Sequence, residues 1–244
     1  FPNGFNVSCP ENCDGGLEIS VSGGTPPYNV FWFGPSDFKA EGEVLDDLCA
    51  GEFMFYVEDL NFCAVSGIVE LLSPEEIIIQ LISETFPGGN QIACFGENTG
   101  SIQTNVEGDS DPFTYNWSGP NGFTSDAANL ESLFAGNYFL ELTDANGCSE
   151  TGSIELTQPE FPLIVDAGED QTFDGINSIF LGGNPAASGG LGEYAYSWNN
   201  PGLLDNPNLA NPEIITLESS TSFELEVTDV LSTCVAKDSV NVDF

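Results

Sequence analysis

Short runs in which hydrophobic and polar residues alternate recur along the chain, each followed by turn-forming residues. In the first run Leu17, Ile19 and Val21 alternate with polar residues, as in a strand with one buried face. A Gly- and Pro-rich turn over 23–27 and an aromatic run over 28–32 come next. No segment keeps the 3.6-residue period of a helix with capping residues, so the pattern predicts strands and little helix.

The same order of elements returns 85 positions later. Residues 1–75 align with residues 86–160 without a gap, and about two dozen positions are identical. Trp32 falls on Trp117, for example, and the later copy repeats the alternating strands and the turns between them. A fixed long period indicates tandem copies of one folding unit.

Residues 164–244 follow the same order more loosely. Tyr196-Ser197-Trp198 resembles the aromatic strand of the second copy, and Phe223, Leu225 and Val227 alternate with glutamates. Short strands separated by turns at intervals of about 8–12 residues are typical of a β-sandwich. We therefore expect an all-β chain of three tandem Ig-like or PKD-like β-sandwich modules, with limits at 1–78, 79–163 and 164–244.

The predicted modules are joined by short linkers that contain proline. Pro74-Glu75-Glu76 precedes the second module, and Pro159 and Pro162 precede the third. Proline fixes one backbone dihedral angle and stiffens such segments. The sequence thus predicts a semi-rigid row of modules.

Charge excludes several classes of function. The chain has 39 acidic residues, two basic residues and no histidine, for a formal net charge of −37. Phosphate backbones and anionic membrane surfaces would be repelled, so we predict no nucleic-acid partner. No run of 18 apolar residues is present, which argues against membrane insertion. Without histidine or arginine there is no Ser-His-Asp triad, histidine zinc site or guanidinium clamp, and we predict that the protein is not an enzyme.

Seven cysteines in small β modules indicate disulfides and an extracellular or periplasmic location. Cys94 and Cys148 are the only cysteines of the second copy, so they are predicted to pair with each other. By equivalence, Cys9 is predicted to pair with Cys63.

Three cysteines fall outside these two predicted pairs. Cys13 and Cys49 align with Asn98 and Phe134, so they are predicted to form an additional disulfide in the first module. Cys234 is left over. It is interpreted as a buried free thiol, an intermolecular partner or half of a bridge whose other half lies outside this sequence.

Carboxylates and aromatic residues provide the remaining candidates. Asp59, Asp144 and Asp229 recur at one place in each module, where a carboxylate accepts backbone N–H bonds at a turn or, alternatively, binds calcium. Further weak calcium candidates are Asp109, Asp111, Asp166 and Asp170. We predict no cofactor, with a structural calcium ion as the alternative. The tryptophans are predicted to fill cores, with sugar stacking as the alternative. Weak candidates for glycan contact are Phe33, Phe38 and Phe123.

Residues 1–160 resemble the SprB-type repeat of large surface adhesins from gliding and marine Bacteroidetes. The resemblance rests on Gly-Gly-Thr-Pro-Pro-Tyr at 23–28, Trp32, Ala-Gly-Glu-Phe at 50–53 and Thr-Asp-Ala-Asn-Gly-Cys at 143–148. It implies type IX secretion, a cell-surface location and no enzymatic activity.

Residues 164–244 resemble the PKD-like, Ig-fold modules of the same secreted proteins. The likeness rests on Ala-Gly-Glu-Asp-Gln-Thr at 167–172 and Leu-Gly-Gly at 181–183. Phe173-Asp174 stands where such modules often have an early cysteine.

Together these features predict a non-enzymatic structural segment of a large secreted adhesin or extracellular filament. The expected partners are other modules of the same long chain, with a homo-oligomer or surface glycans as alternatives. Because the chain opens with Phe1, we interpret it as a mature or excised piece of a longer secreted protein. The alternative function is a glycan- or surface-binding module.

Overall fold

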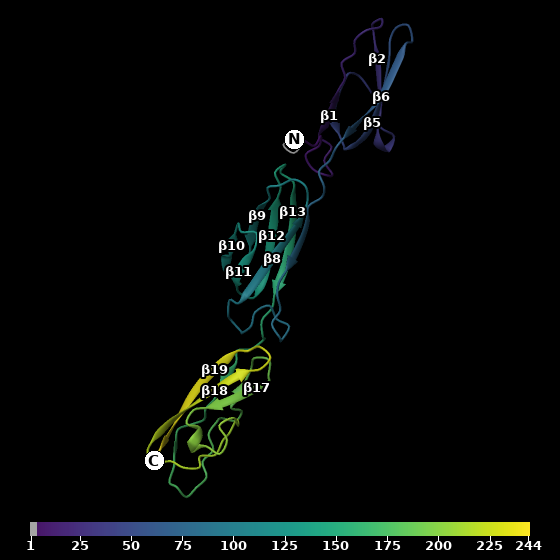
Figure 1. Cartoon of the computed structure of the whole chain (residues 1–244). Helices are drawn as coiled ribbons and strands as arrows, with labels where there is room; N and C mark the ends of the chain where they lie inside the picture. Colours follow the sequence, from purple (N-terminus) through teal and green to yellow (C-terminus); the bar gives the residue numbers. More distant parts are fainter. Residues whose placement is uncertain (1–3) are drawn as a thin grey trace.

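Three β-sandwiches follow one another in an elongated row (Figure 1). The structure, a computed structural model, describes residues 4–244. We call the sandwiches module 1 (strands β1–β6), module 2 (β7–β13) and module 3 (β14–β19). Within the described residues, helix is confined to the single 3-10 turns η1 (Pro35–Asp37), η2 (Pro120–Gly122) and η3 (Pro201–Leu203). The prediction of an all-β chain of tandem sandwiches is confirmed.

Module 2 shows the complete arrangement of one repeat. Its first sheet has the order β10-β9-β12-β13 and its second sheet the order β11-β8-β7. The strands are β7 (Ile78–Ile82), β8 (Gly100–Glu107), β9 (Thr114–Ser118), β10 (Thr124–Ser125), β11 (Leu130–Leu133), β12 (Gly136–Thr143) and β13 (Ser149–Leu156). Strand β7 begins at the end of the predicted first range but pairs with β8, so it belongs to the sheet of module 2.

Module 1 repeats this arrangement with one strand fewer. Its strands are β1 (Gly15–Glu18), β2 (Asn29–Phe33), β3 (Lys39–Glu41), β4 (Val44–Leu48), β5 (Gly51–Glu58) and β6 (Ala64–Leu71). The sheet β3-β2-β5-β6 matches its counterpart in module 2, but the described second sheet consists of β1 and β4 alone. Among the described residues, module 1 has no counterpart of β7.

Module 3 has its own variant of the sandwich. Strand β15 adds to its main sheet in parallel with β19, giving the order β15-β19-β18-β17, and β14 pairs with β16. The strands are β14 (Ile164–Val165), β15 (Gln171–Thr172), β16 (Ala187–Ser188), β17 (Tyr194–Trp198), β18 (Thr221–Asp229) and β19 (Val235–Asp243).

Each module has its own core around one tryptophan. Trp32, Trp117 and Trp198 are nearly fully buried. Each indole N–H donates a hydrogen bond of 2.9–3.1 Å to a backbone carbonyl, the partners being Gly42, Ala127 and Leu209. Burial of a large ring with its polar atom paired stabilises such a core. The tryptophans therefore fill cores, as predicted, and their burial rules out the alternative of sugar stacking.

Candidate functional site

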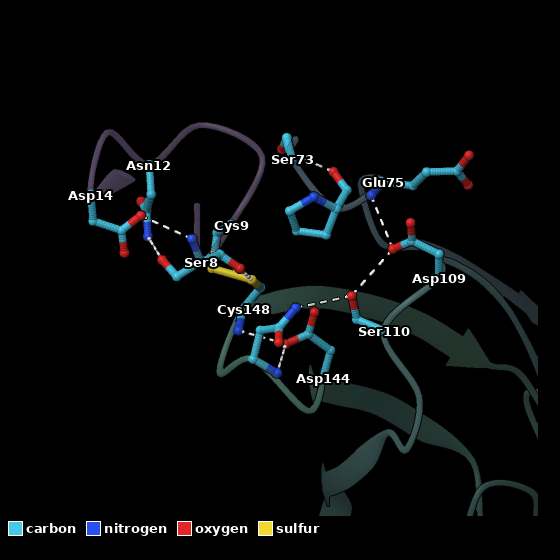
Figure 2. The surroundings of a disulfide bond; sticks show 12 residues. Ser8, Cys9, Asn12, Asp14, Ser73, Glu75, Asp109, Ser110, Asp144 and Cys148 are labelled. Atoms are coloured by element: carbon cyan, nitrogen blue, oxygen red, sulfur yellow. Dashed lines mark hydrogen bonds between the residues drawn. A yellow bond between two sulfur atoms is a disulfide. The ribbon is translucent and has the colours of Figure 1, made fainter. Parts of the chain in front are cut away.

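The chemically distinctive sites of this chain are the two joints between modules. At the first joint, the loop that opens module 1 lies over the β12–β13 turn of module 2 (Figure 2). Cys9 from this loop forms a disulfide with Cys148, across a sequence separation of 139 and with 5.6 Å between the Cα atoms. This spacing is normal for a disulfide.

The turn that carries Cys148 is organised by Asp144. Its carboxylate accepts hydrogen bonds from the backbone N–H groups of Asn146, at 2.9 Å, and Cys148, at 2.8 Å. Figure 2 shows these bonds beside the disulfide. An aspartate that accepts backbone N–H bonds fixes a tight turn, and here it also holds the cysteine backbone in place.

Asp59 and Asp229 do the same in modules 1 and 3. Asp59 accepts N–H bonds from Thr25, Asn61 and Cys63, each 2.9 Å long. The bonds from Cys63 and Thr25 lower the pKa of Asp59 below its ordinary value. Burial tends to raise the pKa of Asp229, but bonds from the N–H groups of Leu191 and Ser232 lower it overall. The turn interpretation of these aspartates is confirmed.

A polypeptide linker gives the first joint its second connection. Ser73 and Glu75 lie on this linker (Figure 2), and the N–H of Glu75 donates to Oδ1 of Asp109 at 3.0 Å. The chain then enters module 2 as β7, whose pairing with β8 begins at Ile78 and Glu107. Modules 1 and 2 are thus connected twice, once by the main chain and once by a disulfide.

The second joint is built in the same way. Cys94 of the module 2 opening loop is bonded to Cys234 of module 3, with Cα atoms 5.6 Å apart. The Gln158 side chain accepts the N–H of Gly96 at 2.8 Å, and the N–H of Gly190 donates to the carbonyl of Phe161 at 3.0 Å. These bonds tie the linker to the module on either side.

The predicted disulfides within modules, Cys9–Cys63 and Cys94–Cys148, are wrong. In module 2, Gln91 near the opening loop bonds to Thr157 beyond the end of β13, whereas Cys148 immediately precedes that strand. Eight residues of strand span roughly 26 Å, far more than the 7 Å or so that disulfide Cα atoms tolerate. The two cysteines of one copy therefore lie at opposite ends of their module and meet cysteines of the adjacent modules instead.

The other cysteines complete the revised assignment. Cys13 pairs with Cys49 within module 1, as predicted. Cys234, the predicted leftover, is buried and bonded to Cys94. Among the described residues, the cysteine without a disulfide partner is Cys63, which is exposed.

The calcium candidates are not brought together. Within residues 4–244, no group of three or more His, Cys, Asp or Glu side chains has an arrangement that could hold a metal ion. Asp109 accepts the linker N–H, Asp166 accepts the N–H of Gly168, and Asp170 accepts the N–H of Asn241. Asp111 is exposed in the segment between β8 and β9. These carboxylates organise the backbone in separate places.

Two of the three aromatic glycan candidates pack against module cores. Phe38 lies edge-on to Phe53 and Phe123 edge-on to Tyr138, with ring centroids 5.6 Å and 5.4 Å apart. Phe33 is 38% exposed at the end of β2. The structure therefore does not gather these rings into one stacking surface.

Comparisons with known proteins give one family match. Residues 90–122, which run from the opening loop of module 2 to η2, match the SprB repeat. No curated protein matches the chain. The SprB match and the three disulfides indicate an extracellular structural segment of a kind associated with cell surfaces. The described residues include no helix with the length and hydropathy needed to cross a membrane.

Several solved structures with consecutive β domains are similar to the chain at low identity. The three N-terminal domains of the bacteriophage RB49 Highly Immunogenic Outer Capsid protein match at 14% identity and a TM-score of 0.49, over 98% of this chain and 96% of that one. Extracellular domains 3–5 of Drosophila OTK match at 11% identity and a TM-score of 0.30, over 90% and 86%. The amphioxus IgVJ-C2 molecule matches at 14% and 0.30, over 60% and 98%. Similarity at this level carries no information about function.

Proposed function

We propose that this chain is a non-enzymatic, semi-rigid spacer within a large secreted cell-surface adhesin or extracellular filament. The observation that carries the proposal is the double connection at each joint, where a short linker and a disulfide join adjacent modules. A joint with two covalent connections has fewer bending and twisting motions than a joint with one, since the second bond removes conformations from the flexible state.

The family and export route belong to the same proposal. Modules 1 and 2 are two copies of an SprB-type repeat, because they share the order of the four-stranded sheet, the tryptophan core and the aspartate turn. Module 3 is a PKD-like relative, and the chain leaves the cell by type IX secretion. Its partners are other modules of the same surface protein.

Small-angle X-ray scattering of the oxidised protein tests the spacer role. We expect the distance distribution of an elongated rod, which broadens and shifts to shorter distances in the double variant Cys9→Ser/Cys148→Ser, because the first joint then bends. The double variant Cys13→Ser/Cys49→Ser is the matched control, since it removes a disulfide inside module 1 and leaves both joints intact.

Two results would contradict the proposal. A compact distribution for the unmodified protein is incompatible with a spacer. A Cys9→Ser/Cys148→Ser profile identical to that of the unmodified protein would show that the disulfide does not restrict the joint. Side-by-side association into a homo-oligomer would appear in the same experiment as a concentration-dependent increase in mass.

A further inference from the structure

We propose that the outer end of module 1, formed by residues 18–25 and 57–65, is a docking site for one further module of the same construction. The docked module would contribute two groups, an edge strand like β7 and a cysteine like Cys9. The inference goes beyond the spacer role because it names a partner surface and its chemistry, and it rests on two independent features of module 1.

The first feature is an unpaired strand edge. In module 2, β7 pairs with residues 103–107 of β8, from Ile82↔Gln103 to Ile78↔Glu107. The counterparts of these residues in module 1 are 18–22, and β1 ends at Glu18. Among the described residues, no strand pairs with residues 19–22 on the side that β7 covers in module 2, while on the β4 side the N–H of Ile19 donates to the carbonyl of Glu43 at 2.9 Å. Unpaired backbone at a sheet edge is a template for an added strand.

A hollow beside this edge has the position that Ile77, the residue before β7, takes in module 2. It measures about 200 Å³, and its lining includes Val21, Gly23, Tyr28 and Val65. In module 2, the backbone of Ile77 passes at this place, 3.8 Å from where a Cβ on Gly108, the counterpart of Gly23, would lie. Further along, Ile79 and Leu81 pack over Gly152 in module 2, whereas the Phe55 ring covers the counterpart Gly67 in module 1.

Exposed apolar side chains surround the same hollow. Leu60 is 59% exposed, Phe62 80% and Val65 60%, whereas their counterparts in module 2 are Ala145, Gly147 and Glu150. Phe62 also has a φ of +63° where module 2 has a glycine. A bulky residue in the left-handed region is uncommon, and exposed apolar groups mark interaction surfaces.

The second feature is the free thiol of Cys63. Its counterparts Cys148 and Cys234 are both buried in disulfides with a cysteine from the opening loop of the preceding module. The backbone of Cys63 is already held as in the bonded turn, since its N–H lies 2.9 Å from Oδ1 of Asp59 and that of Cys148 lies 2.8 Å from Oδ1 of Asp144. Cys63 is thus placed as the receiving half of a third inter-module disulfide.

The two features identify one occupant. At the first joint, module 1 delivers the linker that becomes β7 and also the cysteine that bonds Cys148. One module docked on the outer end would therefore deliver both groups again. Module 3 of a second copy of this chain does not fit the site. It has Phe173-Asp174 in place of an opening cysteine, and its strand β19 is already paired on both sides.

The covalent step is thiol–disulfide exchange. The Cys63 thiolate attacks a mixed disulfide on the incoming cysteine, an S–S bond forms between the two proteins, and the small thiol departs as thiolate. Starting from two thiols, an oxidised dithiol oxidoreductase accepts the two electrons and two protons and becomes its dithiol form. Both routes balance and end in the same inter-module bond.

A graft tests the strand. Residues 74–85 are placed directly ahead of Phe1, which recreates the connection that precedes Phe86, and a second protein receives the same residues in scrambled order as the control. We expect hydrogen exchange at residues 20–22 to slow at least tenfold in the graft and to stay unchanged in the scrambled control. Unchanged exchange in the graft, with β7 and β8 still protected, would overturn the strand site.

A peptide tests the cysteine. The probe is residues 90–98, with Cys94 carried as a mixed disulfide with thionitrobenzoate, and release of the coloured thiolate reports the reaction with the grafted protein. We expect the native-order peptide to react at least tenfold faster than a scrambled peptide, and Cys63→Ser to abolish the release. Equal rates for the two peptides, or Cys63–Cys63 dimers as the main product, would mean an ordinary exposed thiol. Failure of either arm leaves the scattering test of the spacer role unaffected.

Discussion

Modules 1 and 2 align without a gap yet differ at one end, the end that residues 18–25 and 57–65 form in module 1. The corresponding end of module 2 faces module 1, and it has strand β7 and a buried disulfide to module 1. The outer end of module 1 has an unpaired edge, a hollow and an exposed thiol. The core and the aspartate turn are shared. The comparison shows which two parts the described residues of module 1 lack at this end, an edge strand like β7 and a disulfide partner for Cys63.

The comparison predicts that module 1 is the less stable of the two. Trp117→Ala and Trp32→Ala remove equivalent buried rings, and each should lower the free energy of unfolding of its own module by about 3–5 kcal/mol. Because module 1 lacks the pairing and packing that β7 provides, the change should unfold module 1 at 25 °C and leave module 2 largely folded. Hydrogen exchange resolved by module measures this.

The matched controls for the tryptophan pair lie on exposed strand positions. Met54→Ala and Phe139→Ala remove side chains that are 44% and 54% exposed at the same place in the two modules. Both should change stability far less than the tryptophan variants. If Trp32→Ala is tolerated as well as Trp117→Ala, the proposed difference in stability is wrong.

A substitution with a smaller expected effect should loosen β7 and make module 2 resemble module 1 at this edge. Ile79 and Leu81 lie over the β13 backbone, with their methyl groups 3.3 Å and 3.2 Å from where a Cβ on Gly152 would be. The double variant Ile79→Ala/Leu81→Ala removes half-buried apolar surface and should lower the stability of module 2 by about 1–3 kcal/mol. Residues 103–107 should then exchange faster, approaching the rate at 18–22.

Ile78→Ala is the control on the same strand, because the Ile78 side chain is 55% exposed. It should leave exchange at 103–107 close to that of the unmodified protein. Equal effects of the two variants would mean that β7 is held by backbone pairing alone, and the hollow in module 1 would then need no apolar occupant.

The sequence was sufficient for the fold because its signals are local. Alternating residues around Leu140 and Phe55 identify strands, and turn residues such as Asn146-Gly147 separate them. The tryptophans repeat once per module and are large and apolar, so their place in the core follows from the same pattern. Each of these signals depends on contacts within one module.

Disulfide pairing could not be obtained in the same way. An offset of 85 relates Cys9 to Cys94 and Cys63 to Cys148, but pairing within a copy and pairing between adjacent copies satisfy it equally. Each choice leaves one cysteine over, either Cys234 or Cys63. The choice depends on which end of the sandwich each loop occupies, and strand direction in the folded module decides that. The calcium candidates could not be chosen from sequence for a similar reason. With 39 acidic residues, many carboxylates are neighbours in the sequence, but the described residues do not bring three or more of them together as a metal site.

Low pH should cause the smallest of these effects, a loss of stability in module 1. Backbone N–H bonds from Cys63 and Thr25 hold the pKa of Asp59 below its ordinary value. A carboxyl with a lower pKa in the folded state stabilises the fold above its unfolded pKa of about 3.9, and this contribution disappears as pH falls through the folded pKa. Below about pH 4, Asp59→Asn should therefore lose less stability than the unmodified protein, with Glu11→Gln on the exposed opening loop as the control. Thermal unfolding of module 1 at several pH values measures the difference, and parallel pH profiles for all three proteins would show that the Asp59 carboxylate does not hold the turn that carries Cys63.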